Sequence, residues 1–321
     1  MTEHFSKTYT SPEDLVKLLM SRGLQVSNEA KAAAYLRNIG YFRLSAYFYP
    51  FLKKPKNLHQ YKKRSSFNKV LKLYRFDRKL RLMMFNEIEK IEVAVRSTMV
   101  NIVCAETNDP FWMTNARYFA SSSEYRETMK LIKKEYDRSR EDFIKHFKQK
   151  YSEPYPPAWE LVEILPLGVI TRIYGNIRDF RIQKMIAKRF YLNIPVFESW
   201  MTILTLTRNS CCHHARVWNR EYTIKALRMK KMQRPWINNN IGQNRVFYNL
   251  TIIKYFLDII SPSNHLKQNL LELFKKYPSA DKKAMGFPGE WGNEPLWNWV
   301  KTCTLGRHFP GSAEGFLCRF P

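Results

Sequence analysis

The chain has 321 residues, and 54 Lys and Arg against 28 Asp and Glu give it a formal net charge of +26 at pH 7. Its 45% hydrophobic content is enough to bury a substantial core, which excludes an intrinsically disordered tail. A charge surplus of this size favours a polyanionic partner, a nucleic acid or an anionic membrane, over a basic protein that has no such partner.

The longest apolar runs, 197–207 and 246–260, are too short or too interrupted by charge for a spanning helix, which needs roughly 18 apolar residues. Residues 1–12 contain no secretory signal, so we expect a cytoplasmic protein without a membrane partner. The five cysteines have no framework spacing, and we expect reduced thiols at Cys104, Cys211, Cys212, Cys303 and Cys318.

Glycine is scarce, and apolar residues mostly recur at intervals of three and four, so the pattern predicts an all-α fold. A first helix is expected over 11–23, where a serine precedes a proline and two acids, and Ser27 is expected to cap a second helix that ends at Asn38. Gly40 then opens an aromatic stretch that continues to Phe51.

Residues 52–64 are polar and carry six basic side chains without one acid, which predicts an exposed loop. The functional interpretation of this loop is contact with the phosphate backbone of RNA. Its basic residues are Lys53, Lys54, Lys56, Lys62, Lys63 and Arg64.

The longest periodic segment begins at Ser66 and runs to Val103, which predicts either one long helix or two stacked helices as the spine of the core. A basic link adds Lys230 and Lys231 as candidate RNA contacts. No fixed repeat and no glycine-rich phosphate loop is present, so a nucleotide triphosphatase has little support. Further helices are expected over 124–150, 158–176, 178–190, 195–214, 243–260 and 262–277, and the end of the chain is expected to be irregular.

Two cysteines and two histidines stand together at 211–214, which suggests a zinc site. Consecutive helical residues point about 100° apart, however, and cannot converge on one tetrahedral ion. We therefore expect no metal and no other cofactor.

A second interpretation of this segment uses the spacing Arg208-x4-His213 with Asn209 beside the arginine. On a helix, Asn209 and His213 share a face, so the amide can hydrogen-bond the imidazole. A guanidinium suits phosphate oxygens, and an imidazole can move a proton near neutral pH, which together match ribonuclease chemistry. The alternative is a histidine that only caps or packs at a helix end, because this spacing also arises by chance.

Three stretches of the chain, in order, resemble the Abi-like family of bacterial abortive-infection proteins. They are 40–47 (GYFRLSAY), 74–96 (YRFDRKLR continuing to IEKIEVAVR) and 208–220 (RNSCCHH followed by WNR). The resemblance covers roughly residues 11–222. This family is similar to the HEPN superfamily of helical ribonucleases, whose Arg-x4-6-His motif has a polar residue after the arginine, and Arg208, Asn209 and His213 occupy those positions.

The resemblance implies a HEPN-type helical bundle with additional N- and C-terminal helices. We expect an N-terminal helical region with the basic loop over 1–65, a HEPN-like core over 66–222, a C-terminal helical region over 223–301 and an irregular tail over 302–321. The resemblance to the Abi-like family further implies metal-independent RNA cleavage and a homodimer that brings two motifs together. It also implies a role as an anti-phage or toxin effector restrained by a small noncoding RNA or an antitoxin.

In this hypothesis Arg208, Asn209 and His213 are catalytic, and His214 packs or gives support. Glu89, Glu92 and Arg96 share a helix face and either anchor Arg208 through a salt bridge or form solvated pairs. Arg220 joins the RNA-binding residues. The rival hypothesis, from a different class, is a non-catalytic RNA-binding module in a defence ribonucleoprotein.

Overall fold

The computed structural model describes residues 4, 8–238 and 240–298, and within them it confirms the predicted all-α fold. This part of the chain contains thirteen α-helices and no β-strand, and none of these helices combines the length and apolarity needed to cross a bilayer. The helices are α1 (Pro12–Ser21), α2 (Glu29–Ile39), α3 (Tyr41–Phe48), α4 (Phe67–Thr107), α5 (Ser122–Arg138), α6 (Asp142–Lys150), α7 (Ala158–Ile164), α8 (Leu167–Gly175), α9 (Phe180–Arg189), α10 (Ile194–Cys212), α11 (Val246–Ile260), α12 (Leu266–Lys276) and α13 (Pro295–Asn298).

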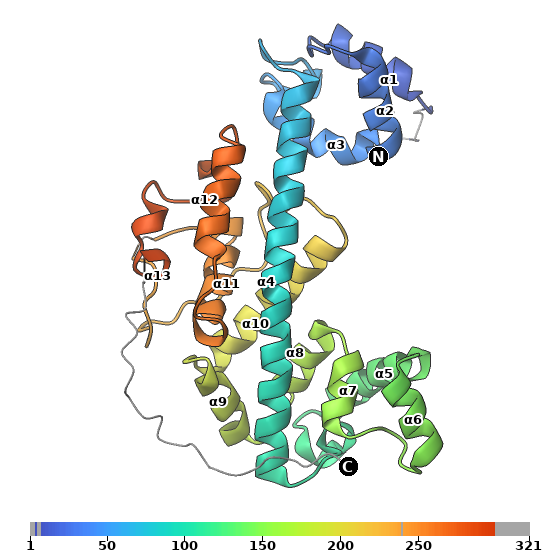
Figure 1. Ribbon diagram of the computed structural model, residues 1–321, viewed down its shortest axis with the longest axis vertical. Coiled ribbons are helices and arrows are strands. Elements are labelled where there is room, and N and C mark those ends of the chain that lie inside the picture. Colours follow the sequence, from blue (N-terminus) through green and yellow to red (C-terminus); the bar gives the residue numbers. More distant parts are fainter. Residues whose placement is uncertain (1–3, 5–7, 239, 299–321) are drawn as a thin grey trace.

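Helix α4 is the spine of the molecule (Figure 1). It is one continuous helix of 41 residues and about 60 Å, so the alternative of two stacked helices is wrong. The Ser66 side chain accepts the amide N–H of Lys69 at its start, and Asn108 ends it in the left-handed conformation. Helices α3, α7, α8, α9, α10, α11 and α12 all pack against it.

Two expected helices are each divided in two. The expected helix over 124–150 is α5 followed by α6, because Ser139 and Glu141 are extended and the Ser139 hydroxyl accepts the Glu141 amide. The expected helix over 158–176 is α7 followed by α8, since Pro166 disfavours helical geometry at Leu165, which is extended.

Other helix boundaries also differ from expectation. The side chain of Asn28, and not that of Ser27, caps α2. Helix α12 begins at Leu266 and not at Pro262, which lies in a turn, and α11 begins at Val246. The expected irregular tail over 302–321 lies outside the described residues.

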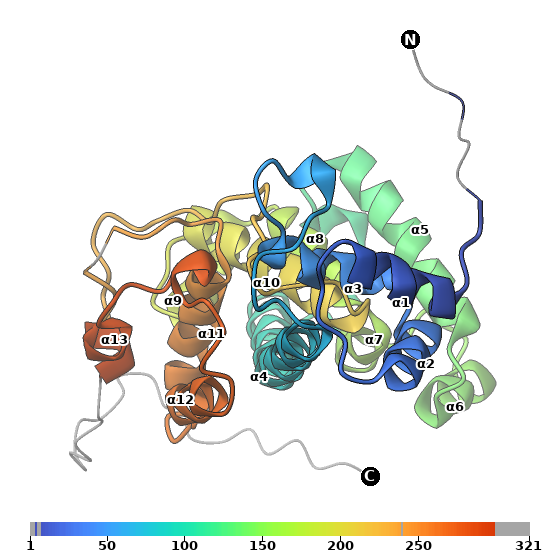
Figure 2. The ribbon, with the colours of Figure 1, turned by 90° about the horizontal axis from the view of Figure 1, so that it is seen from above.

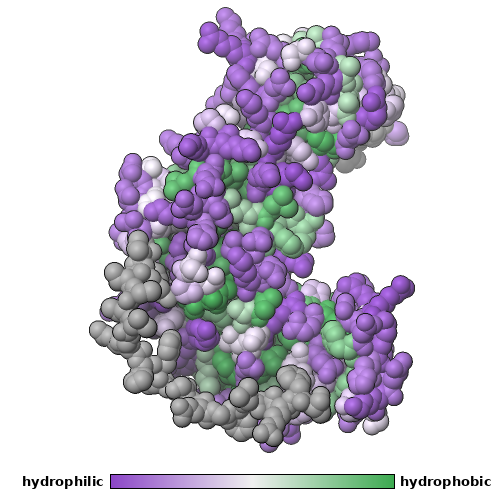
Figure 3. All heavy atoms as spheres, viewed as in Figure 1, coloured by the Kyte–Doolittle hydropathy of each residue, from purple (hydrophilic) through white to green (hydrophobic). Residues whose placement is uncertain are grey.

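The helices surround α4 unevenly. Seen from above, α11, α12 and α13 lie on one side of α4, and α1, α2, α5 and α6 lie on the other (Figure 2). The space-filling view shows a broad hollow between the N-terminal helices and the lobe of α5 and α6 (Figure 3). The C-terminal end of α10 reaches this side of α4 (Figure 1).

Asp77 joins three segments that are far apart in the sequence. Its carboxylate is fully buried on α4 and accepts hydrogen bonds through both oxygens. Oδ2 accepts from the hydroxyl of Tyr47 on α3, at 2.5 Å, and from Arg81 one turn further along α4. Oδ1 accepts from the backbone amides of Val217, at 3.1 Å, and Trp218, at 2.6 Å, in the segment after α10.

These contacts hold the segment after α10 in place. Burial raises the pKa of Tyr47, with a further contribution from Asp77, so the phenol stays protonated and donates. Four donors satisfy the two oxygens of one buried carboxylate, and Arg81, itself buried, balances its charge. The three stretches that resemble the Abi-like family therefore meet at Asp77.

We expect Asp77→Asn to lower the free energy of unfolding by about 3–5 kcal/mol, because it leaves the buried Arg81 without a counter-charge and turns one NH2 group toward existing donors. Urea unfolding followed by circular dichroism measures this loss. Asp142→Asn is the matched control, since its partner Lys145 lies on the surface, and should cause no measurable change. Equal stability of the two variants would contradict the role of Asp77.

Candidate functional site

Helix α10 carries the Arg208-x4-His213 motif at its C-terminal end. The helix packs against α4, α8 and α11, and buries Trp200, Leu204 and Cys211 among them. Arg208 on the last turn is half-buried, and Asn209 is exposed. Packing of the apolar face therefore fixes the helix and leaves these two polar side chains toward the surface.

The end of α10 is a Schellman motif, which closes the helix two residues before the expected end at His214. The amide of His214 donates to the carbonyl of Cys211, at 3.1 Å, and the amide of Ala215 donates to that of Ser210, at 2.9 Å. His213 is the C-cap, and His214 adopts the left-handed conformation with φ of 55°. The Nη1 group of Arg43 on α3 donates to the carbonyl of His214 at 2.8 Å.

Asn209 and His213 are joined through the backbone. The His213 amide donates to the Asn209 carbonyl at 2.9 Å, which keeps the two residues on one side of the helix end. Among the described residues no hydrogen bond links the Asn209 amide group to the His213 imidazole, although the sequence allows one. Both side chains are exposed and are free to contact a ligand.

Glu92 on α4 lies between two arginines. Its Oε2 is 3.6 Å from Nε of Arg208, and its Oε1 accepts from Nη2 of Arg96. The sequence allowed either an anchor for Arg208 or solvated surface pairs. Glu92 and Arg96 form an inward network with Arg208, whereas Glu89 is exposed and has no ion-pair partner within 8–238 and 240–298. Arg96 also donates, at 2.7–3.0 Å, to the carbonyls of Val162, Glu163 and Leu165 around the end of α7.

The two Nη groups of Arg208 are available to bind a ligand. Its Nε is buried and faces Glu92 without a hydrogen bond, and its guanidinium carbon lies 5.9 Å from the centre of the Phe85 ring. In the part of the chain that the structure describes, neither Nη group donates to a protein acceptor. The site thus presents a positive fork at the surface that matches the oxygens of a phosphate.

The basic loop lies away from this motif. Its six basic residues precede the start of α4 at Phe67. Arg208 pairs with Glu92, which is about 38 Å from that start along the α4 axis. Lys56 Nζ lies 3.5 Å from the centre of the Tyr49 ring, and Lys62 Nζ donates to the Pro50 carbonyl at 2.9 Å. The other four basic residues, Lys53, Lys54, Lys63 and Arg64, are exposed.

The remaining candidate RNA contacts lie after α10. Lys230 and Lys231 are exposed in the link to α11. Arg220 is half-buried, donates to the Ser210 hydroxyl at 3.1 Å and stacks on Tyr222. The structure therefore gives Arg220 an inward contact, and RNA binding by all three residues stays a prediction.

The cysteines near the motif are free thiols. Cys211 is buried, which raises its pKa to about 12 and keeps it protonated, and Cys104 and Cys212 are also free. Cys303 and Cys318 lie outside the described residues. Across 8–238 and 240–298, no three His, Cys, Asp or Glu side chains are grouped as a metal site would require.

Sequence reasoning gave no role to Asp77, Arg81 or Arg43, although all three belong to stretches that resemble the Abi-like family. A signal for the first two was present, because opposite charges four residues apart stand beside the apolar positions Phe76 and Leu80. No local signal connected Arg43 to the end of α10.

The left-handed conformation of His214 yields a prediction about stability. His214→Val should lower the free energy of unfolding by about 1–2 kcal/mol, because a β-branched residue fits this region worst, whereas His214→Gly should be tolerated. Thermal unfolding of both variants measures the difference. His213→Val, at a φ of −82°, is the control and should have the smaller effect. Equal losses for all three would count against a backbone role.

A family model described as Abi-like protein matches residues 34–219, more than half of the chain. No curated protein and no solved structure matches the chain. The matched range contains Asp77 and all of the Arg208, Asn209 and His213 motif. The chain therefore belongs to the Abi-like protein family.

Proposed function

We propose that the protein is a metal-independent endoribonuclease whose catalytic residues are Arg208, Asn209 and His213. The observation that carries this proposal is that the C-terminal end of α10 presents both the Nη groups of Arg208, which have no acceptor among the described residues, and the exposed imidazole of His213. Membership of the Abi-like family indicates a role in abortive infection, and RNA cleavage would fulfil that role. The expected location is the cytoplasm, where phage RNA and host RNA are accessible.

The proposed reaction is a transesterification within RNA. The 2′-oxygen attacks the adjacent phosphorus, the bond from phosphorus to the 5′-oxygen breaks, and the products carry a 2′,3′-cyclic phosphate and a 5′-hydroxyl. One His213 takes the proton of the 2′-hydroxyl, and a second protonates the leaving oxygen. Each such proton transfer typically contributes about 10²- to 10⁴-fold. DNA lacks the 2′-hydroxyl and is not a substrate.

Arg208 would stabilise the negative charge that builds up on the phosphoryl oxygens. Its Nε side is held toward Glu92, which is itself held by Arg96, so the fork is oriented before the substrate arrives. Asn209, which is exposed, would bind a phosphate oxygen or orient the imidazole once RNA is bound.

A homodimer supplies the second histidine in this proposal. The base and the acid must act on opposite sides of the phosphorus, and each chain presents one His213. His214 is the neighbouring imidazole, but its backbone is fixed by the Schellman motif and by Arg43.

Light scattering should therefore give the mass of a dimer for the active species, and a monomer that cuts RNA would contradict the shared arrangement.

The basic surface would hold the RNA and any RNA inhibitor. The net charge of +26 and the exposed lysines of the basic loop and of the link after α10 support contacts with the backbone of a strand. A small noncoding RNA or an acidic antitoxin could occupy this surface and restrain the enzyme until infection.

We expect His213→Ala to reduce cleavage of labelled single-stranded RNA about 10²- to 10⁴-fold, and Arg208→Ala to reduce it about 10²- to 10³-fold. The assay contains EDTA and a DNA strand of matched sequence, and it identifies the 2′,3′-cyclic phosphate by mass spectrometry. His146→Ala, an exposed histidine on α6, is the matched control and should cut normally.

Thermal unfolding of each variant separates loss of chemistry from loss of fold. Glu92 keeps Arg96 as a partner when Arg208 is removed, so Arg208→Ala should fold. Cleavage that persists in His213→Ala would contradict the proposed chemistry. Tight RNA binding without cleavage by the wild type, even after removal of copurifying nucleic acid, would favour the non-catalytic RNA-binding module.

A further inference from the structure

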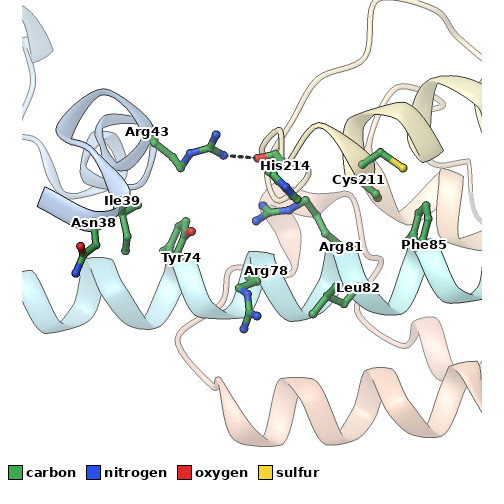
Figure 4. A pocket seen from close by; sticks show the side chains of 11 residues that line it. Asn38, Ile39, Arg43, Tyr74, Arg78, Arg81, Leu82, Phe85, Cys211 and His214 are labelled. Carbon is green, nitrogen blue, oxygen red and sulfur yellow. Dashed lines mark hydrogen bonds between the residues drawn. The ribbon is translucent and has the colours of Figure 1, made fainter. Parts of the chain in front are cut away.

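A cavity of about 640 Å³ opens beside the motif, between the end of α2, the start of α3, one face of α4 and the end of α10 (Figure 4). Its volume lies within the range of 300–1,000 Å³ that is typical of small-molecule sites. It does not include the side chains of Arg208, Asn209 or His213, which makes it a neighbour of the proposed catalytic site and not part of it.

The charge of the cavity wall favours an anion. Arg43, Arg78 and Arg81 line the cavity, and among the described residues no Asp or Glu side chain does. The buried Asp77 balances Arg81, and Arg43 and Arg78 have no ion-pair partner in the described part of the chain. Arg43 donates from Nη1 to the His214 carbonyl, as Figure 4 shows, and keeps its remaining N–H groups. Arg78 is exposed and has no hydrogen-bond or ion-pair partner among the described residues.

The same cavity has an aromatic and apolar side. Tyr74, Leu82 and Phe85 line it from α4, and both Leu82 and Phe85 are exposed despite their size. Unpaired bases stack on aromatic side chains of this kind, and each stacked base contributes about 1–3 kcal/mol. The amide of Asn38 lies at the rim, is exposed, and offers both a donor and an acceptor to a base edge.

We propose that this cavity binds one nucleotide of a single-stranded RNA, with the phosphate at Arg43 and Arg78 and the base against Leu82 and Phe85, which are one turn apart on α4. Guanidinium groups facing a stacking surface, without a competing carboxylate, match a nucleoside phosphate. Phe85 joins this cavity to the catalytic site, because the guanidinium of Arg208 lies 5.9 Å from its ring. The bound nucleotide is therefore close to the phosphate that is cut, and this position rests on the proposed function.

The test compares two charge reversals at adjacent positions of α4. Arg78→Glu alters the cavity, whereas Lys79→Glu makes the same change of charge at an exposed residue outside it. Both are made in the full chain that also carries His213→Ala, so that RNA stays intact. The probe is a fluorescein-labelled single-stranded RNA of twelve nucleotides, and fluorescence polarisation at fixed salt gives the dissociation constant.

We expect Arg78→Glu to weaken RNA binding about tenfold or more relative to Lys79→Glu, because it removes charge-assisted hydrogen bonds to a phosphate. In RNA that contains 4-thiouridine, ultraviolet light should crosslink the base to a peptide that includes Phe85, and Arg78→Glu should abolish this crosslink. Equal binding by the two reversals, with the crosslink retained or never formed, would overturn the proposal.

Competition with the four nucleoside monophosphates identifies the source of the nucleotide. Failure of millimolar mononucleotides to displace the RNA supports a site for a strand. If mononucleotides displace the RNA, and Arg78→Glu weakens this displacement, the proposal of a site for a strand is wrong and the cavity binds free nucleotides. If the wild-type protein gives the crosslink but never cuts RNA, the proposed ribonuclease is refuted and the cavity proposal stands. If the wild-type protein cuts RNA but the two charge reversals bind RNA equally, the cavity proposal is refuted and the ribonuclease stands.

Discussion

The buried carboxylate of Asp77 is the constraint on which the rest of the site depends. Its donors come from α3, from α4 itself and from the segment after α10, so these segments cannot shift independently without leaving a buried polar group unpaired. Arg43 adds a second tie, from α3 to the His214 carbonyl. The exposed His213 therefore stands just before a stretch of backbone that is fixed at two points, and its position is set by residues that do not touch it.

Glu92 imposes a second constraint, on charge. The Glu92 carboxylate lies close to two guanidinium groups, those of Arg96 and Arg208. The two arginines therefore carry about one positive charge that no carboxylate of the described residues compensates. The carbonyls around the end of α7 accept from both Nη groups of Arg96, whereas the Nη groups of Arg208 have no acceptor among the described residues. The uncompensated charge is thus directed to the surface through Arg208, and a phosphodiester would supply the missing negative charge.

Local sequence signals predicted what is local in the fold. The periodicity and the serine cap before Phe67 located α4, and the arginine-to-histidine spacing located the candidate site. Pro166 was a sequence signal for the break between α7 and α8, although the apolar periodicity continues through it. The break after α5 comes from the extended backbone at Ser139 and Glu141, where no proline or glycine signals the end of a helix. The contacts of Asp77 join residues 30, 140 and 141 positions apart, and no periodic pattern carries such a pairing.

The arrangement also separates two kinds of recognition. Arg208 and His213 would contact only a phosphate and a ribose hydroxyl, which are the same in every RNA, so they give the reaction no dependence on sequence. Bases differ in their edges and faces, and beside this motif the cavity offers both an aromatic wall at Phe85 and an unpartnered amide at Asn38 within the described residues. Because Phe85 lies against both Arg208 and the cavity, a base held there would set which neighbouring phosphate reaches the arginine. Any preference for cleavage at particular sequences would then arise in the cavity and not at the catalytic residues.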